Sequence, residues 1–461
     1  MEVFIILTQI KKHPLILGTF LLTGAGIISR ILGFFYRIFL SRTIGANVLG
    51  LYQLIFPVFT LCLAISASGI QTAISRFVAS EKNGKKYLYT GLVISGSLSA
   101  IFTLGIYILA PWLANEILKE PRTEELLRLM CFALIPACVH SCFNGYYYGR
   151  KKSTIPSICQ ITEQLARIFG TLIIYQILLS QDLPLEPIHA VWGLVISELA
   201  GLLVNLTAYL GCDTSCISSC SDSSLRTNIA SMKHVVLANS QTTLGPLLAM
   251  AFPLTLNHVL MTLSHSMEHL LIPQKLVEYG YTSDEALSHF GILTGMAMSV
   301  IFFPAVITNS LSVLLLPRIS EAKAKGDSNL VLDTIKGALC CGLALGSLCT
   351  FLFLFSSEWI GIYIFDNMLA GFYVQILSIL CPFMYTSSLL NSIVNGLGYA
   401  SLTLVCNLSG CAIRIAAIWL FVPVYGMYAY IVAMILSHIV TTVELIGIVI
   451  IKYKRLHENQ T

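Results

Sequence analysis

Twelve long apolar segments follow one another along the chain, and each could form a helix that crosses a bilayer, which needs about 20 apolar residues. They lie near residues 15–40, 50–75, 87–114, 127–148, 155–179, 188–211, 244–271, 287–316, 333–356, 371–396, 401–421 and 426–451. Charged residues make up 11% of the chain, against about 25% in soluble proteins. The sequence predicts an all-α integral membrane protein, and its arginine-containing first segment is expected to stay in the mature chain.

Lysine and arginine are distributed unevenly among the loops between these segments. If the N-terminus is cytoplasmic, the outer loops contain only Arg42, Lys119, Arg122, Arg128 and Lys275, and most other basic residues fall on the inner side. Short cytoplasmic loops are enriched in basic residues. We therefore predict that both chain termini are cytoplasmic.

Short sequence pairs recur about half a chain apart, in the same order. They are FP at 56–57 and 303–304, NG at 144–145 and 395–396, RI at 167–168 and 414–415, and ELxG at 198–201 and 444–447. Each half holds six segments, an even number, so both copies enter the membrane in the same direction. The pattern predicts a parallel internal repeat, with an N-terminal lobe at 1–211, a polar cytoplasmic linker at 212–235 and a C-terminal lobe at 236–461.

The stretch SRILGFFYRIFLSR places Arg30 and Arg37 in the first apolar segment and Arg42 just after it. A charged side chain near the bilayer centre costs about 2.5 to 3.5 kcal/mol on insertion scales and normally faces a protein interior or an aqueous cavity. Arg30 and Arg42 could instead extend toward the inner and outer headgroups. Arg37 lies well along the segment, which favours a cavity, and a guanidinium group is suited to phosphate oxygens.

The stretch SRILGFFYRIFLSRTIGA resembles the first helix of the lipid II flippases (MurJ type) and of the stage V sporulation protein B-like polysaccharide exporters. LGLYQLIFPVFTLCLAISASGIQTAISRFVASE, EQLARI and LLPRISEA fit the same families. The resemblance is to the multidrug/oligosaccharidyl-lipid/polysaccharide exporter superfamily. It implies two six-helix lobes around a central cavity, and transport of a polyprenyl-pyrophosphate-linked saccharide from the inner to the outer leaflet of the bacterial cytoplasmic membrane.

In the flippases, basic residues of the first helix line the cavity, and this role would carry over to Arg30 and Arg37. The flippases also have basic residues in the second helix, where this sequence has the uncharged FTLCLAISASG. The resemblance therefore implies a lipid-linked saccharide without specifying lipid II. A multidrug exporter of the same superfamily is the alternative, and it would use an acidic site for a cationic substrate.

Several further charged residues fall inside predicted helices. Glu163 and Arg167 are four residues apart and could neutralise each other. Glu198 and Glu444 occupy equivalent places in the two halves and either brace the lobes or titrate during transport. Arg414 is assigned to the substrate cavity, with a cross-helix pair to a carboxylate as the alternative.

The seventh segment contains NHVLMTLSHSMEHLL, in which His258, His265, Glu268 and His269 share one broad helical stripe. HSMEH matches H-x-x-E-H, a signature in which two histidines bind zinc and the glutamate activates water. An intramembrane zinc hydrolase is therefore one hypothesis. The favoured one is that Glu163, His265 and Glu268 take up a coupling cation or proton.

No enzymatic activity and no cofactor are expected, and the expected partners are the saccharide lipid and the bilayer rather than a nucleic acid. The chain lacks a G-x-x-x-x-G-K-[ST] phosphate loop, so ATP hydrolysis by that route is not expected. Cys212, Cys216 and Cys220 are spaced by four in the linker and could suit a metal, although the spacing matches no standard site.

Overall fold

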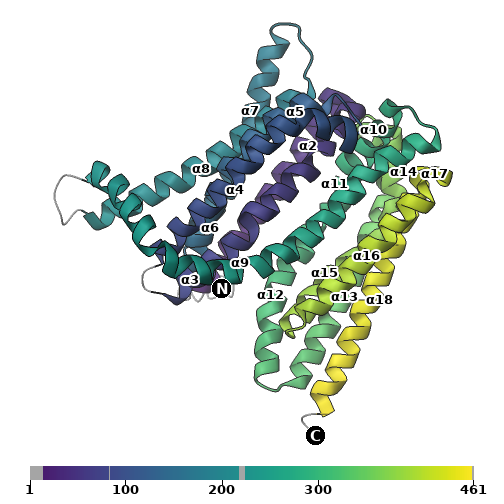
Figure 1. Cartoon of the computed structure of the whole chain (residues 1–461). Helices are drawn as coiled ribbons and strands as arrows, with labels where there is room; N and C mark the ends of the chain where they lie inside the picture. Colours follow the sequence, from purple (N-terminus) through teal and green to yellow (C-terminus); the bar gives the residue numbers. More distant parts are fainter. Residues whose placement is uncertain (1–13, 82–83, 218–223, 459–461) are drawn as a thin grey trace, which may run out of the picture. The chain divides into compact units, whose positions relative to one another are not determined.

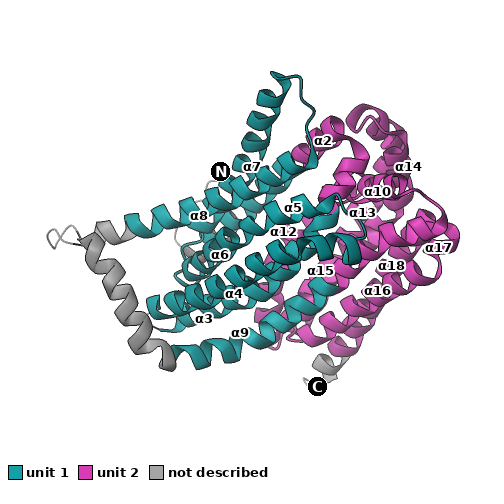
Figure 2. Cartoon of the chain, turned by 45° about the horizontal axis from the view of Figure 1, so that its top comes forward, with its two compact units in different colours: residues 1–33, 54–263 teal, residues 34–53, 264–461 magenta. Residues whose placement is uncertain are grey.

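The computed structural model describes residues 14–81, 84–217 and 224–458, and all regular elements in these ranges are helices (Figure 1). The described residues form two compact units (Figure 2). Unit 1 contains residues 1–33 and 54–263, and unit 2 contains residues 34–53 and 264–461. The side chains of Cys212, Cys216 and Cys220 lie outside the described part, so the metal hypothesis for the linker stays a prediction.

Unit 1 is built around five helical stretches, which are α3, α4 with η2, α5 with η3 and α6, α7, and α8. Parts of α2 and α9 complete it. The elements are α2 (Pro14–Leu63), η1 (Ala64–Ser68), α3 (Gly69–Ser80), α4 (Lys85–Trp112), η2 (Leu113–Ile117), α5 (Thr123–Met130), η3 (Cys131–Ala133), α6 (Leu134–Gly149), α7 (Thr154–Leu179), α8 (Pro187–Ile217) and α9 (Ser224–Tyr279). Residues 34–53 of α2 and 264–279 of α9 belong to unit 2.

Unit 2 contains the remaining helices. They are α10 (Ser283–Gly291), η4 (Ile292–Ala297), α11 (Met298–Phe302), α12 (Ala305–Ala324), α13 (Ser328–Trp359), η5 (Ile360–Ile364), α14 (Met368–Leu377), η6 (Ser378–Leu380), α15 (Cys381–Gly396), α16 (Ala400–Leu420), α17 (Val422–Tyr425) and α18 (Met427–Glu458). A capping box of Thr282 and Glu285 starts α10.

Ten helices in the described ranges are long and apolar enough to cross a membrane. Eleven of the twelve predicted spans fall on them, because the stretch Leu21–Ser80 contains two. The twelfth, 155–179, is α7, a continuous helix whose apolar character is reduced by Glu163, Arg167 and neighbouring polar residues. The prediction of an all-α membrane protein with about twelve transmembrane helices is confirmed.

Gly45 separates the first two predicted spans within α2. Its φ of 76° and ψ of 174° are not helical, and φ in this range favours glycine. The segment between Phe34 and Gln53 packs within unit 2, where Gly50 lies against the backbone of Leu287. The break at Gly45 thus lies inside the part of α2 that belongs to unit 2, and α2 passes from one unit to the other at residues 33/34 and 53/54.

The same helix pairs are in contact inside each unit. In unit 1, α6 contacts α3, α4 and α8, and in unit 2, α15 contacts α12, α13 and α18. The two NG glycines lie at corresponding contacts, since an added Cβ at Gly145 would lie 2.5 Å from the carbonyl oxygen of Gln71 and one at Gly396 would lie 2.9 Å from that of Leu316. These contacts support the internal repeat inferred from the sequence.

A buried apolar cluster lies at equivalent helices in each unit. The cluster in unit 1 joins α3, α4, α6 and α9, and the cluster in unit 2 joins α12, α13, α15, α16 and α18. The compact units differ from the predicted lobes in the assignment of residues 34–53 and of the start of α9. The lobe boundaries at 211 and 236 stay a prediction.

Candidate functional site

The three arginines of α2 have different environments. Arg30 lies sixteen residues after Pro14 and fifteen before Gly45, about 23 Å from either point at 1.5 Å per residue. Its side chain is exposed, and the described residues give it no ion pair or side-chain hydrogen bond. Arg37 is half-buried, and Arg42 donates a hydrogen bond to the carbonyl oxygen of Tyr363. Arg42 is thus held near the end of the first helix of α2, whereas Arg30 lies at its middle.

Unit 1 contains a group of ionisable side chains that we call the unit 1 polar cluster: His140 on α6, Cys159, Glu163 and Arg167 on α7, and Glu198 on α8. His140 links the two carboxylates, because its Nε2 lies 2.9 Å from Oε2 of Glu198 and its Nδ1 lies 3.5 Å from Oε1 of Glu163. The Cys159 thiol donates to Oε1 of Glu163 at 2.9 Å. Three helices therefore meet at one polar centre.

Arg167 is paired differently from the expectation. Its Nη2 lies 3.6 Å from Oε1 of Glu198, and its Nε and Nη2 both donate to the Ser197 hydroxyl. Among the described residues no ion pair joins it to Glu163, its neighbour one turn earlier. The reason is tertiary: α6 and α8 bring His140 to Glu163 and Glu198 to Arg167.

Unit 2 contains a buried ion pair between Glu268 on α9 and Arg414 on α16. Nε and Nη2 of Arg414 donate to the two carboxylate oxygens of Glu268 at 2.8 and 2.9 Å. The pair is completed by Ser437, which accepts from Nη1 at 3.0 Å, and by Tyr430, which donates to Glu268 at 3.2 Å. Arg414 and Glu268 are only 8% and 3% exposed. Arg414 was considered as a cavity residue or as one half of a cross-helix pair with a carboxylate, and the structure shows the cross-helix pair.

The HSMEH stretch does not form the arrangement that a zinc hydrolase would require. Arg414 holds both carboxylate oxygens of Glu268, and the ring of His269 packs edge-on against Phe290 at 5.6 Å. His265 is largely exposed, with its Nδ1 3.9 Å from Glu268. Glu268 is therefore the partner of a guanidinium group rather than a general base beside two metal-binding histidines.

Residues 15–323 match the polysaccharide biosynthesis protein family. The chain belongs to this family. It is 26% identical to stage V sporulation protein B of Bacillus subtilis (strain 168) over 442 residues. The alignment covers 94% of this chain and 82% of that protein. Membership in the multidrug/oligosaccharidyl-lipid/polysaccharide (MOP) superfamily, in the branch of stage V sporulation protein B, follows from these matches and from the fold.

Two solved structures share the fold. A lipid II flippase MurJ in an inward closed conformation aligns with a TM-score of 0.69 at 14% identity, covering 95% of this chain and 90% of that one. An inward-facing multidrug resistance MATE family transporter of the MOP superfamily aligns with a TM-score of 0.68 at 14% identity, covering 94% and 96%. This polysaccharide biosynthesis family member is thus a multi-pass membrane protein with the fold of MOP transporters.

Sequence reasoning about this family member missed His140, which is the centre of the unit 1 polar cluster. Its only signal was its position inside an apolar segment four residues before Asn144 of the NG pair. The sequence repeat drew attention to Glu198, but it did not predict that Glu198 contacts His140 and Arg167. Its counterpart Glu444 accepts a hydrogen bond from Ser409 at 2.7 Å, so the equivalent glutamates have different partners in the two units.

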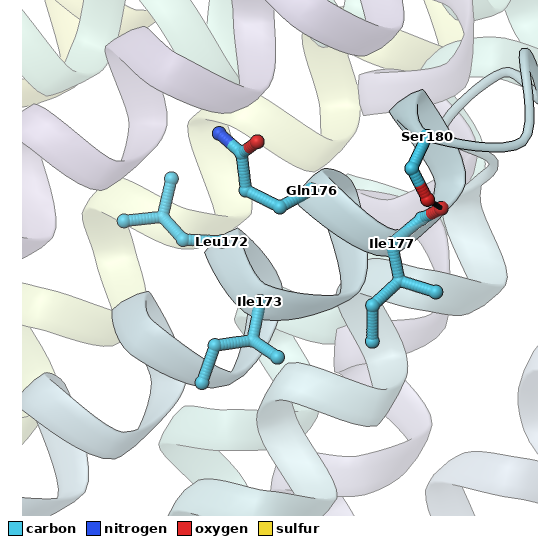
Figure 3. A pocket seen from close by; sticks show the side chains of 5 residues that line it. All are labelled: Leu172, Ile173, Gln176, Ile177 and Ser180. Carbon is cyan, nitrogen blue, oxygen red and sulfur yellow. Dashed lines mark hydrogen bonds between the residues drawn. The ribbon is translucent and has the colours of Figure 1, made fainter.

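A shallow hollow on the surface of unit 1 lies along the C-terminal half of α7 (Figure 3). It is lined by Leu172, Ile173, Gln176, Ile177 and Ser180, all from this helix and the turn that follows. None of the ionisable residues of the unit 1 polar cluster lines it. Its mainly aliphatic lining indicates a surface that suits lipid tails better than a charged group.

Gly201 lets α8 approach Glu163 closely, so Gly201→Ala should destabilise unit 1. A Cβ at position 201 would lie 2.8 Å from Cγ of Glu163 and 3.0 Å from its Cδ, so the glutamate must move. Overpacking of this kind typically costs about 1 to 3 kcal/mol. Thermal unfolding of the purified protein in detergent should show a lower midpoint for the variant.

Gly447 is the matched control, because it is the equivalent glycine of the second ELxG and an added Cβ there meets no atom within 4 Å. Gly447→Ala should leave the midpoint unchanged or raise it slightly, since alanine favours helix over glycine by about 1 kcal/mol. Equal effects of the two substitutions would show that the approach of α8 to Glu163 is not tight.

Proposed function

We propose that this chain is a flippase that moves a polyprenyl-pyrophosphate-linked oligosaccharide or cell-wall precursor from the inner to the outer leaflet of the bacterial cytoplasmic membrane. Transport would proceed by alternating access of the two lobes, with both termini cytoplasmic. The observation that carries the proposal is Arg30, an exposed guanidinium at the middle of an apolar helix, without an ion pair among the described residues.

The contrast with two other intramembrane arginines supports a substrate role for Arg30. Arg167 lies beside Glu198 and Arg414 is bound by Glu268, so their charges are already balanced by the protein. Arg30 has no such carboxylate. A charge at this depth is costly unless it meets water or an anion, and a guanidinium group matches the oxygens of a pyrophosphate. Arg37, seven residues later, is proposed to contact the same group.

The alternative within the superfamily is export of a cationic drug, and the fold shared with a multidrug transporter makes it a specific competitor. Such an exporter would need carboxylates available to the substrate. In unit 2, Glu268 is bound by Arg414, and in unit 1, Glu163 and Glu198 lie beside His140 and Arg167. The charges therefore favour an anionic substrate over a cationic one.

We further propose that a cation or proton drives the cycle, with Glu163, His265 and Glu268 as the coupling residues. Moving a two-state equilibrium from 1:99 to 99:1 needs about 5.5 kcal/mol. One elementary charge that crosses the membrane potential supplies about 2.3 kcal/mol per 100 mV. Binding energy from the substrate must therefore contribute to the conformational change together with the ion.

A vesicle assay tests the proposed function. The purified protein is reconstituted with a fluorescent polyprenyl-pyrophosphate-linked saccharide, and a membrane-impermeant quencher measures the fraction that reaches the opposite leaflet. We expect protein-dependent flipping of this lipid and none of the same polyprenol without its pyrophosphate saccharide. Transport of a lipophilic cation, with no flipping of the anionic lipid, would instead establish the multidrug alternative.

A further inference from the structure

We infer that the unit 1 polar cluster is a transition-metal site that binds Zn²⁺ through His140, Cys159 and Glu163. One nitrogen, one sulfur and one oxygen from these side chains all lie within 4.8 Å of one another, on the neighbouring helices α6 and α7. Imidazole, thiolate and carboxylate are each ligands of Zn²⁺, which holds them in a tetrahedral arrangement. The inference goes beyond the proposed function and does not rest on it. A metal ion held by Glu163 would leave His265 and Glu268 as the coupling residues.

The distances between the ligand atoms fit one ion. Bonds of about 2.0 to 2.3 Å to a tetrahedral zinc hold its ligand atoms roughly 3.3 to 3.8 Å apart. Nδ1 of His140 and Oε1 of Glu163 are already 3.5 Å apart. Sγ of Cys159 and Oε1 of Glu163 are hydrogen-bonded at 2.9 Å, so the thiol proton must leave and the two atoms must separate slightly. Metal binding thus replaces an S–H bond by an S–metal bond and releases one proton.

The charges around the site balance when the ion is bound. The two positive charges of Zn²⁺ and the one of Arg167 offset the three negative charges of the Cys159 thiolate, Glu163 and Glu198, while His140 is neutral. The buried Glu198 and the half-buried Arg167 are part of the same network. A neutral assembly avoids the large penalty for an uncompensated charge in a low-dielectric interior.

The residues that surround the three ligands have the arrangement of a metal site. Glu198 holds Nε2 of His140 at 2.9 Å, which directs Nδ1 toward the ion, as in carboxylate–histidine–zinc sites. Asn205 donates to Sγ of Cys159 at 3.1 Å. The side-chain amide of Asn144 lies 3.5 Å from Nδ1 of His140, and its Oδ1 is buried without a hydrogen-bond partner.

The side-chain oxygen of the half-buried Asn144 is available as a fourth ligand, because it has no hydrogen-bond partner among the described residues. A buried amide oxygen without a partner costs about 1 to 3 kcal/mol. Rotation of this amide by 180° exchanges its oxygen and nitrogen and would turn the oxygen toward His140. Oδ1 of Asn144, or a water molecule that it binds, would then complete the fourth position on the ion.

The repeat in unit 2 lacks the site. Cys406 is equivalent to Cys159, but Gly410 stands where Glu163 is expected and Asn391 where His140 is expected. The other group of three potential ligands in the described residues is His265, Glu268 and Cys411. There Arg414 binds both oxygens of Glu268 and also donates to Cys411, so a cation is already in place. The metal site is therefore specific to unit 1.

Cobalt substitution tests the site in the full-length protein. Co²⁺ takes the same ligands as Zn²⁺ and gives an absorption band when it binds a thiolate. The purified protein is stripped with a chelator, in a background with Cys212, Cys216 and Cys220 replaced by serine. We expect one Co²⁺ per chain, a sulfur-to-cobalt band, and displacement of the cobalt by Zn²⁺, which binds more tightly.

Variants assign the signal to the cluster. Cys159→Ser should abolish the band, Cys406→Ser should keep it, and Glu198→Gln should weaken metal affinity about 10- to 100-fold because it removes the residue that orients His140. Zn²⁺ should raise the unfolding midpoint of the parent and of Cys406→Ser, but not of His140→Gln. An unchanged band in Cys159→Ser, or no cobalt bound to the parent in excess Co²⁺, would overturn the inference.

Discussion

Arg30→Ala is expected to abolish flipping of the lipid-linked saccharide while leaving the amount of folded protein unchanged. The side chain is exposed and makes no ion pair or side-chain hydrogen bond within the described residues, so its removal breaks no polar contact among them. Loss of a charge-assisted hydrogen bond to the pyrophosphate costs about 1.5 to 3 kcal/mol, which corresponds to roughly 10- to 150-fold in affinity. Binding of the polyprenyl pyrophosphate to detergent-purified protein and the vesicle assay both measure this effect.

Arg30→Lys should recover part of the affinity, because lysine keeps the charge and loses the planar fork. Arg42→Ala is the matched control, since Arg42 is also an exposed arginine of α2 but donates to the Tyr363 carbonyl near the end of the first helix. It should bind and flip the lipid within about twofold of the parent. Parent-like affinity in Arg30→Ala would remove Arg30 from the substrate site and withdraw the main support for an anionic substrate.

Arg414→Met is expected to destabilise the protein by about 3 to 5 kcal/mol. The substitution leaves the Glu268 carboxylate buried and without its bidentate partner, and an uncompensated buried charge has a cost of this size. The double variant Glu268→Gln with Arg414→Met removes both charges and should recover much of the loss. Thermal and denaturant unfolding in detergent of the parent, Arg414→Met, Glu268→Gln and the double variant would measure the four free energies of unfolding needed for a double-mutant cycle.

Lys325→Met serves as the control, because Lys325 forms an ion pair of similar length with Glu321 in which both side chains are 66% exposed. Exposed pairs contribute little to stability, so no measurable change is expected. The double variant also tests coupling in vesicles. If lipid flipping by the double variant depends on ion concentration and voltage as it does in the parent, Glu268 is only a structural partner of Arg414. The proposed coupling role would then be left to Glu163 and His265.

The positions of most transmembrane helices could be read from the sequence because helix length and apolar composition are local properties. The predicted span 155–179 coincides with α7, a continuous helix of 26 residues, although polar side chains reduce the hydropathy of this helix. Its Glu163 and Arg167 are tolerated because other polar groups on α6 and α8 satisfy them. The break at Gly45 was placed only as a gap between apolar segments, and its non-helical backbone comes from the structure.

The sequence by itself determined that this chain is an all-α membrane protein with an internal repeat. Hydropathy is a property of each segment, and the repeat is visible when short sequence pairs in the two halves are compared. Tertiary structure alone decided which charges meet. Glu163 has Arg167 one turn away but lies beside His140, 23 residues earlier, and Arg414 is joined to Glu268 across a sequence separation of 146. The physical reason is that a buried charge requires a partner in contact, and helix packing, rather than proximity along the chain, brings the partners together.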